Sequence, residues 1–343
     1  MTTGKAFNGK PYVRNPHVRF DEGEVSSCTA ETSVRTKSCR TQPDGRVNGC
    51  ASTPRHASLF YMGCVKLAIV GFATALCGFE TVSKPAYDTL ISHRGESFDA
   101  PENTLPAYKM AVEHGFGFEC DIYLSADKRL FTFHDSDLKR TTAGANTNAC
   151  TAVRWDNTIS KVNVGGWGKW KGSKFDPTRP ALLDEVLALA RPGRKIYVEV
   201  KGDNPEWVPY IKEVFAKEPK ATPDTVLFIA FGGKMCAELK RQMPEYKTYW
   251  LTWSRRGWGK DAPAITLDYV LSKLKETGAD GVDCHFNPDI ITADFISSVK
   301  SAGFEFHVWT IDDPKTAEEA FRRGSETVTT NRAKFILDSF EGR

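Results

Sequence analysis

Apolar and polar residues follow two alternating periodicities along most of the chain. From about residue 84 onward, short apolar or alternating runs typical of β-strands are followed by longer runs with apolar residues three and four positions apart, as in helices. The predicted strands are 89–93, 117–124, 129–134, 195–200, 226–231, 248–253, 281–284, 304–311 and 327–329. The predicted helices are 105–114, 182–190, 207–218, 234–242, 267–277, 292–302, 314–323 and 333–340.

This alternation predicts an α/β protein, and its length selects the architecture. Strand–helix repetition over about 260 residues is the usual size of a (β/α)₈ TIM barrel. A doubly wound open sheet is the alternative, but no GxGxxG motif follows the first predicted strand. We therefore expect residues 80–343 to form one barrel domain.

The first 61 residues have a different composition from the rest. They are rich in Thr, Ser, Arg, Gly and Pro and show no sustained helical or strand period. We interpret residues 1–61 as a disordered leader that need not belong to the natural product. Met62 offers a second start, and residues 62–79 then read as a signal peptide.

The signal-peptide interpretation depends on a short apolar run. Lys66 precedes 13 apolar or small residues from Leu67 to Phe79, which are too few for a comfortable membrane span. Residues 73–75 (ATA) give a small-x-small cleavage site, and Cys77 gives a weaker lipid-anchor alternative. A short internal helix is the remaining alternative. We expect export to a periplasm or to the outside of the cell, with membrane contact only through this leader or an anchor.

Charge excludes one class of partner. The chain carries a formal charge of +3, but the first 61 residues hold nine basic and five acidic residues, and the remaining 282 hold 37 and 38. The barrel segment is therefore close to neutral, so nothing indicates a nucleic-acid surface. A small molecule is the expected partner, and the sequence leaves the oligomeric state open.

Cysteine spacing excludes a zinc site of the usual kind. Nine cysteines are present, and the four in the barrel segment, Cys120, Cys150, Cys236 and Cys284, form no CxxC pair. Cys120 is expected to be buried in the barrel wall, since it lies between Glu119 and Asp121 on a strand. A disulfide among the other three remains open if the protein is exported.

Polar residues gather at the downstream ends of the predicted strands. His93 ends the first strand, Glu119 and Asp121 lie on the second, and His134 ends the third. Glu199 lies at the end of the next strand, with Lys201 just after it and Trp309 near the end of a late strand. Because side chains two apart on a strand point the same way, Glu119 and Asp121 can hold one hard divalent cation. Strand ends are where barrel enzymes build their sites.

These residues belong to motifs that resemble the glycerophosphodiester phosphodiesterase family. The motifs are HRG at 93–95, PENT at 101–104, ExD at 119–121, HD at 134–135, RTT at 140–142, ExK at 199–201, the loop at 165–187, VWT at 308–310 and TTNRA at 329–333. Each motif is weak alone, but their order on this strand–helix pattern is highly specific.

The resemblance implies a role for each site residue. Glu119, Asp121 and Glu199 would be metal ligands, with Mg²⁺ or Ca²⁺ as the cation. The acid–base pair would be His93 and His134. Arg94 and Lys201 would bind and neutralise the phosphate, and an all-carboxylate ligand set suits these hard cations better than Zn²⁺.

The implied reaction is cleavage of a glycerophosphodiester to an alcohol and sn-glycerol 3-phosphate. The sequence leaves open which histidine is the base, and whether water or a neighbouring glycerol hydroxyl attacks. A phospholipase D-like enzyme that cleaves lysophospholipids or sphingolipids is the enzymatic alternative. A non-catalytic binding protein is the alternative from another class, but every expected catalytic position holds a competent residue.

Several nearby residues have two interpretations each. Glu102 and Asn103 either cap the helix that begins near Thr104 or make polar contacts in the site. Phe231, Trp253 and Trp309 either form an apolar wall for the substrate or pack in the core.

Four other polar residues have less definite assignments. Asp135 is expected to position His134, and His114 and His307 are expected to be structural. His285 is either a loop residue or a substrate contact. Where the family has aspartate after the last strand, this chain has Asn331, which leaves the role of that position open.

Overall fold

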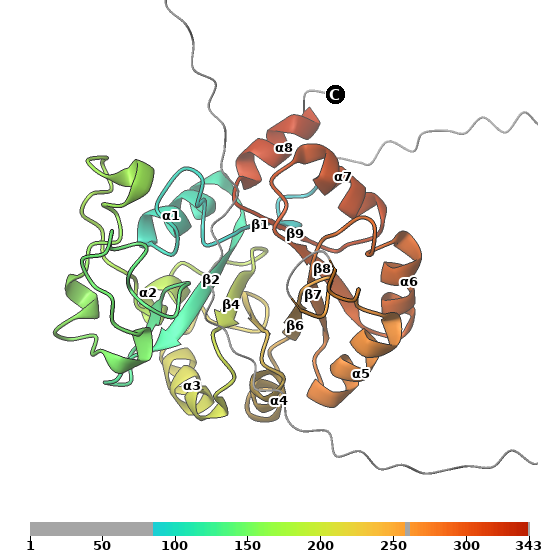
Figure 1. Ribbon diagram of the computed structural model, residues 1–343, viewed down its shortest axis with the longest axis horizontal. Helices are drawn as coiled ribbons and strands as arrows, with labels where there is room; N and C mark the ends of the chain where they lie inside the picture. The colour runs from blue at the N-terminus through green and yellow to red at the C-terminus, as the bar shows by residue number, and fades with distance from the viewer. Residues whose placement is uncertain (1–84, 258–260, 342–343) are drawn as a thin grey trace, which may run out of the picture. The chain divides into compact units, whose positions relative to one another are not determined.

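Eight parallel strands close into a barrel in the computed structural model, which describes residues 85–257 and 261–341. The barrel strands are β1 (Leu90–Ser92), β2 (Gly117–Leu124), β4 (Ile196–Val200), β5 (Val226–Ala230), β6 (Thr248–Thr252), β7 (Gly281–His285), β8 (Glu305–Trp309) and β9 (Val328–Thr330). β1 pairs with both β9 and β2, which closes the sheet and leaves no free edge (Figure 1). The predicted (β/α)₈ barrel is confirmed, and the open doubly wound sheet is wrong.

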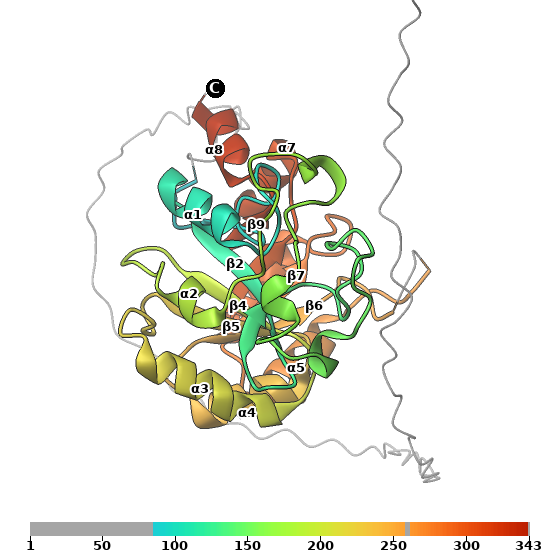
Figure 2. The same ribbon diagram turned by 90° about the vertical axis from the view of Figure 1, so that its left-hand side faces the viewer.

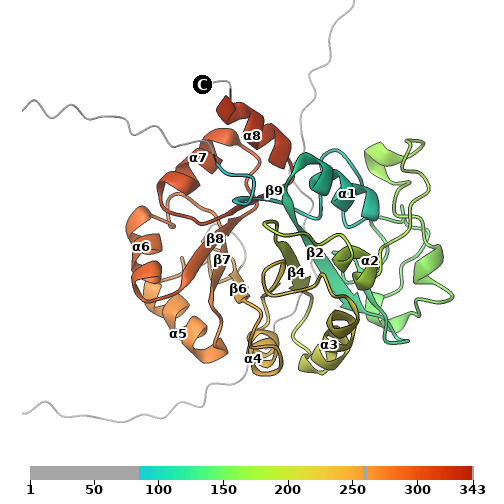
Figure 3. The same ribbon diagram turned by 180° about the vertical axis from the view of Figure 1, so that it is seen from behind.

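Helices surround the strands as a ring, which is also visible from behind (Figure 3). They are α1 (Leu105–His114), α2 (Leu183–Leu187), α3 (Val208–Lys217), α4 (Gly233–Gln242), α5 (Leu267–Thr277), α6 (Ala293–Ser301), α7 (Pro314–Arg322) and α8 (Ala333–Glu341). Several begin at a side-chain cap: Thr104, Thr266, Thr292 and Asp313 each accept a hydrogen bond from a backbone N–H of the first turn. The sequence therefore fixes where these helices start.

The two faces of each barrel strand pack against different partners. Outward residues such as Cys120 and Val198 are buried in the main core against the helices, whereas inward residues such as Tyr197 and Tyr249 fill the barrel interior. Burial of Cys120 in the wall is thus confirmed. All four described cysteines are buried and free, so the disulfide considered among Cys150, Cys236 and Cys284 is wrong for this structure.

The third predicted strand is not part of the barrel. β3 (Leu130–Thr132) pairs antiparallel with the far end of β2, with Ile122 opposite Thr132. The β2–β3 hairpin extends beyond the barrel, and β3 then brings the chain back toward it. At the base of the hairpin, Phe133 donates its backbone N–H to the carbonyl of Asp121. His134 therefore lies two residues beyond β3 and does not end a barrel strand as predicted, but it reaches the same end of the barrel from the opposite direction.

The segment between β3 and α2 forms a small subdomain at the end of the barrel that His134 reaches, and it is drawn in green in Figure 2. It contains the short 3₁₀-helices η1 (Cys150–Ala152), η2 (Ile159–Lys161) and η3 (Gly168–Trp170), and η4 (Pro205–Trp207) precedes α3. A separate cluster of buried apolar side chains, Phe131, Phe133, Leu138, Cys150, Trp155, Ile159 and Val164, holds it together.

The leader predicted at 1–61 and the signal peptide predicted at 62–79 lie outside the described residues. Within the part of the chain that the structure describes, the helices are too short or too polar to cross a membrane.

Candidate active site

Three carboxylates meet at the carboxyl ends of β2 and β4. Glu119 and Asp121 point the same way from β2, and Asp121 lies opposite Glu199 in the parallel register. One carboxylate oxygen from each residue lies within 4.8 Å of the others, and the residues are only 2%, 1% and 9% exposed. The spacing of two and the strand pairing thus bring together the predicted ligand set.

The protonation of these carboxyls reflects their crowding. Burial and the neighbouring Asp121 and Glu199 hold the pKa of Glu119 well above its usual range. Burial also raises the pKa of Glu199 to about 7, against the opposing charge of Lys201. Burial acts to raise the pKa of Asp121 too, but Lys201, His134 and Arg94 outweigh it and hold that pKa well below its usual range.

This donor set fits a hard divalent cation. Glu119 accepts the backbone N–H of Arg94 at one oxygen, but its buried Oε1 has no hydrogen-bond partner. An unpaired buried carboxylate oxygen facing two further carboxylates is costly without a cation nearby. All three residues offer oxygen ligands, which Mg²⁺ and Ca²⁺ prefer.

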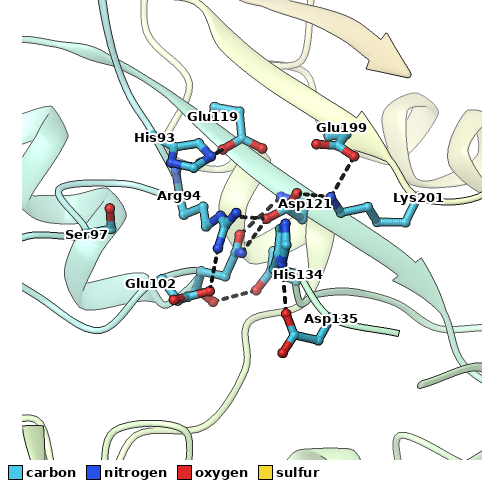
Figure 4. A network of polar contacts seen from close by, with 12 residues as sticks. His93, Arg94, Ser97, Glu102, Glu119, Asp121, His134, Asp135, Glu199 and Lys201 are labelled. Carbon is cyan, nitrogen blue, oxygen red and sulfur yellow. Dashed lines mark hydrogen bonds and ion pairs between the residues drawn. The ribbon is translucent and has the colours of Figure 1, made fainter. Parts of the chain in front are cut away.

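Two basic side chains lie against the same carboxylates. The Lys201 ammonium is 2.7 Å from Asp121 Oδ1 and 2.6 Å from Glu199 Oε1. Arg94 Nε is 3.4 Å from Asp121 Oδ2, and its Nη1 is 2.8 Å from Glu102 Oε1. Figure 4 shows both cations pointing toward Asp121. Their predicted role in phosphate binding remains a prediction, and the structure adds that they neutralise the carboxylates.

His93 is held at one ring nitrogen and open at the other. Its Nδ1 lies 2.8 Å from the Asn331 amide oxygen, while the Asn331 amide nitrogen donates to Asp312 Oδ2 at 2.7 Å. Asp312 can only accept, so it fixes the amide orientation, and the amide oxygen then requires a proton on Nδ1 of His93. Nε2 carries the free lone pair and faces Glu119 at 3.9 Å. Asn331, whose role the sequence left open, orients His93.

His134 is held in the same manner by a carboxylate. Its Nδ1 lies 2.8 Å from Asp135 Oδ1, and Arg140 donates to both oxygens of Asp135. The positioning role predicted for Asp135 agrees with this geometry. Burial and the nearby Arg94 lower the pKa of His93 to about 3 and that of His134 to about 4, so both imidazoles are neutral near pH 7.

Glu102 and Asn103 belong to the site and do not cap the helix. Thr104 is the N-cap of α1, because its hydroxyl accepts the N–H of Ala107. Asn103 instead donates to Asp121 Oδ2 at 2.6 Å and accepts the Asp121 N–H at 3.1 Å. The capping alternative is therefore wrong, because the chain turns at Asn103, where φ is 56°, before the helix begins.

Gly95 completes the HRG motif for a steric reason. It has a φ of 78°, and a Cβ placed there would lie 2.6 Å from the backbone carbon of Ala107. Only glycine allows the loop after β1 to lie this close to α1. The close approach positions His93 and Arg94 above the carboxylates.

Four aromatic rings cluster at the same end of the barrel, at the carboxyl ends of β5, β6, β7 and β8. Ring centroids lie 5.8 Å apart for Phe231 and Trp309, 4.8 Å for Trp253 and Trp309, and 5.0 Å for Trp253 and His285. Phe231 and Trp309 also pack on the interior cluster, whereas Trp253 is 39% exposed. His285 is the last residue of β7 and not a loop residue. The sequence identified three of these rings and left the fourth undecided.

The two histidines predicted to be structural lie elsewhere. His307 is buried inside the barrel, stacked on Tyr249 with ring centroids 4.2 Å apart. His114 is the last residue of α1 and faces Glu96 at 3.7 Å.

Comparison with known families adds a decisive observation. Residues 93–334 match the Glycerophosphoryl diester phosphodiesterase family. The chain belongs to this family. The match begins at His93 and includes every site residue described above.

Relatives of this family agree in sequence along most of the barrel. The chain is 25% identical over 255 residues to a Caldanaerobacter subterraneus glycerophosphodiester phosphodiesterase, covering 73% of this chain and 96% of that protein. It is 26% identical over 275 residues to the macaque (Macaca fascicularis) glycerophosphodiester phosphodiesterase domain-containing protein 4, covering 71% of this chain. The chain spans only 40% of the length of that macaque relative.

Solved structures agree in fold. A phosphodiesterase from Oleispira antarctica, in complex with the product sn-glycerol-3-phosphate, superimposes with a TM-score of 0.64 at 23% identity. The alignment covers 74% of this chain and 97% of that protein. At this identity the likeness supports the barrel fold of the phosphodiesterase family and nothing finer.

One positioning residue of this family site was not assigned as such from the sequence. Glu102 accepts from Arg94 and also receives two hydrogen bonds from Arg140, at 2.7 and 2.8 Å. Since Arg140 also holds Asp135, Glu102 connects the Arg94 side of the site to the His134 side. Glu102 belongs to the PENT motif and Arg140 to the RTT motif, so both residues were visible in the sequence. Their contact was not, because it joins residues 38 positions apart.

Replacement of Glu102 by Gln is expected to destabilise the fold in a pH-dependent way. Burial acts to raise the pKa of Glu102, but Arg94 and Arg140 outweigh it and lower that pKa to about 2. The ionised Glu102 therefore stabilises the fold fully at pH values above its pKa in the unfolded chain. This stabilisation is lost as the pH falls through its pKa in the folded protein. We expect a loss of about 1–3 kcal/mol in the free energy of unfolding at pH 7.

Urea unfolding at pH 7, 5 and 4 measures this effect. The difference between Glu102→Gln and the native chain should be constant down to about pH 4.5 and shrink below it. Glu276→Gln removes an exposed i,i+3 partner of Lys273 and serves as the control, with little change at any pH. A difference that grows as the pH falls would contradict the charge assignment.

Proposed function

We propose that the chain hydrolyses glycerophosphodiesters to an alcohol and sn-glycerol 3-phosphate. One observation carries the proposal: two neutral imidazoles, each held through Nδ1, lie beside a buried cluster of three carboxylates at the carboxyl end of the barrel. Membership of the phosphodiesterase family supports it. The Oleispira enzyme was captured with sn-glycerol-3-phosphate, and we extend that product to this chain as part of the proposal.

A divalent cation, Mg²⁺ or Ca²⁺, would be held by Glu119, Asp121 and Glu199. When bound, such an ion supplies Lewis-acid stabilisation of charge on the phosphate oxygens. The unpaired Oε1 of Glu119 and the raised pKa values of Glu119 and Glu199 support this assignment.

The histidines would carry the proton transfers. One imidazole would accept a proton from the attacking hydroxyl at Nε2. The other, after taking up a proton at Nε2 from solvent, would deliver it to the leaving alkoxide and return to its neutral form. Their Nδ1 partners, Asn331 and Asp135, hold each ring so that only Nε2 is available. Attack by water gives both products directly, and attack by a glycerol hydroxyl gives a cyclic phosphodiester that water then opens.

Arg94 and Lys201 would bind and neutralise the phosphate. Arginine offers a planar pair of N–H donors, and a lysine ammonium acts as a mobile point charge. Both already lie within 3.4 Å of Asp121, so a phosphate entering the site meets preplaced cations. We further propose that Trp309, Phe231 and Trp253 contact the apolar face of the glycerol or the leaving group.

Cleavage of lysophospholipids or sphingolipids in a phospholipase D-like manner is the second candidate. The half-exposed Trp253 beside Trp309 supports it, because an apolar surface at the mouth suits an acyl chain. For both candidates we propose an exported enzyme, in a periplasm or outside the cell, because residues 62–79 resemble a signal peptide.

A coupled assay for glycerol 3-phosphate separates these candidates. The purified chain is incubated with glycerophosphocholine and, in parallel, with lysophosphatidylcholine, and both glycerol 3-phosphate and choline are measured. We expect glycerol 3-phosphate and choline from glycerophosphocholine. Choline released only from the lysolipid, with no product from the soluble diester, would replace the proposal by the second candidate.

A further inference from the structure

We propose that the rim of the barrel beside His93 docks on a membrane surface that carries anionic phospholipids. The contact is made by a patch of aromatic and basic side chains, which we call the rim patch. Its members are Phe98, Lys169, Trp170, Lys174, Arg332 and Phe335. From the sequence, membrane contact was expected only through the leader or a lipid anchor, so this patch is visible only in the tertiary structure.

Three separate segments form the rim patch. The Arg332 guanidinium lies 4.2 Å from the centre of the Phe98 ring and 4.0 Å from that of Phe335. The Lys169 ammonium lies 4.2 Å from the Phe98 ring and 4.5 Å from the Trp170 ring. The loop after β1, the 3₁₀-helix η3 and the start of α8 thus present one continuous surface.

Exposure distinguishes this surface from ordinary packing. Phe98 is 46% and Phe335 45% exposed, the two highest values among the large apolar side chains that the structure describes. Phenyl rings beside cations are favoured at the boundary between lipid headgroups and acyl chains. The geometry therefore fits an interface that is wet on one side and apolar on the other.

The basic charge around the rim patch indicates that its binding partner is an anionic membrane. The segment 165–175 carries Lys169, Lys171 and Lys174 and no acidic residue, within a barrel segment that is close to neutral. Among the described residues, none of these lysines forms an ion pair, nor does Arg332; Asp99 lies near Lys169 and Asp176 near Lys171. Basic side chains that outnumber the acidic side chains beside them attract anionic headgroups. The leader is itself basic, so its charge does not complement this surface.

Position links the rim patch to the site. Phe98 donates its backbone N–H to the carbonyl of Asn331, and Ser97 donates its hydroxyl to the Asn331 amide oxygen that holds His93. Figure 4 shows Ser97 on the His93 side of the cluster. A membrane touching the rim patch would therefore lie next to the mouth of the barrel. On the proposed function, this would admit phosphodiesters that are anchored in the membrane.

Vesicle sedimentation of the full chain tests the docking without any activity readout. Vesicles of phosphatidylcholine alone are compared with vesicles that also contain phosphatidylglycerol. We expect preferential binding to the anionic vesicles. Replacing Lys174 of the rim patch together with the neighbouring Lys171 of the same loop (Lys174→Glu with Lys171→Glu) should lower this binding roughly 10-fold or more. Phe335→Ser, which removes one exposed ring, should lower binding roughly 10-fold by itself.

A matched control pair makes the same change of charge elsewhere. Lys217→Glu with Lys275→Glu alters the last turns of α3 and α5, at the opposite end of the barrel, and should leave binding within about twofold if docking is local. Equal losses in both pairs, or no loss in either patch variant, would overturn the proposal. Absence of binding to anionic vesicles would also overturn it.

The docking and the proposed function fail in different ways. Thermal unfolding of each variant confirms that it is folded, and hydrolysis of soluble glycerophosphocholine should be unchanged in the patch variants. Vesicle binding without any hydrolysis would reject the proposed function and keep the docking. Hydrolysis of the soluble diester without vesicle binding would do the reverse.

Discussion

Replacing either His93 or His134 by Gln is expected to lower kcat/KM for glycerophosphocholine by about 10²–10⁴-fold, the usual contribution of a positioned general acid or base. Glutamine keeps much of the size and a polar end but cannot exchange a proton near neutral pH. The pKa values lowered to about 3 and 4 leave both rings neutral in the free protein. Each ring can therefore accept a proton, which glutamine cannot do.

The double variant provides a sharper form of the same test. If the two rings act on one proton-transfer sequence, removing both should cost little more than removing one. Steady-state kinetics on the two single variants and the double variant measure this non-additivity. Losses that multiply would show that the rings contribute independently and would contradict the paired mechanism.

A histidine outside the site serves as the control. His114 lies at the end of α1, contacts Glu96 and does not face the carboxylates. His114→Gln should change kcat/KM by less than about twofold, because it removes an imidazole without touching the proton transfers. Thermal unfolding of all four variants separates a loss of chemistry from a loss of folded protein.

Removing the divalent cation is expected to have an effect of similar size. EDTA should abolish hydrolysis, and one of Mg²⁺ or Ca²⁺ should restore it. Replacing Glu199 by Gln removes one of the three proposed carboxylate ligands, so we expect the metal affinity to fall at least 10–100-fold. Isothermal titration calorimetry of metal into the chain without substrate measures this directly and needs no turnover.

Stability provides a second readout of the metal. A cation that binds only the folded state raises the free energy of unfolding, by about 2.7 kcal/mol at a concentration 100 times its Kd. The native chain should gain thermal stability on adding metal, and Glu199→Gln should gain less at the same concentration. Metal that stabilises both proteins equally would place the ion elsewhere.

The barrel offers a matched control for this substitution. Asp283 on β7 is 1% exposed, and burial followed by the charge of Glu199 holds its pKa well above the usual range. The raised pKa favours the neutral carboxyl, so Asp283→Asn keeps the shape of the side chain and resembles its neutral form inside the same barrel. Its metal affinity should match that of the native chain, because Asp283 is not among the three proposed ligands.

The predictions on the histidines and on the metal concern residues that were identified from the sequence alone. This was possible because their placement depends on residues a few positions away along the chain. Glu119 and Asp121 share a face because strand side chains alternate, and Glu199 and Lys201 do so for the same reason. The alternation of strand and helix periods, with caps such as Thr104, specified the order of the elements. The closed barrel followed from that order and from the length of the repeating segment.

The tertiary structure decided the contacts between distant residues. Asn331 orients His93 across 238 positions, and Glu102 meets Arg140 across 38. His134 reaches the site through an antiparallel hairpin, although its apolar run reads like one more parallel strand. Periodicity gives the face on which a side chain lies but not the partner of its strand.

The rim patch shows the same division. The basic and aromatic residues of the loop at 165–187 were visible in the sequence as a family motif. Only the folded chain places Lys169 on Phe98 and Arg332 between Phe98 and Phe335. The sequence determined the element order and the chemistry available on each strand, because these depend on neighbours a few positions away. Barrel closure decided which distant groups hold the rings of His93 and His134 and which side chains remain exposed, because those contacts depend on strands and loops that meet only when the sheet closes.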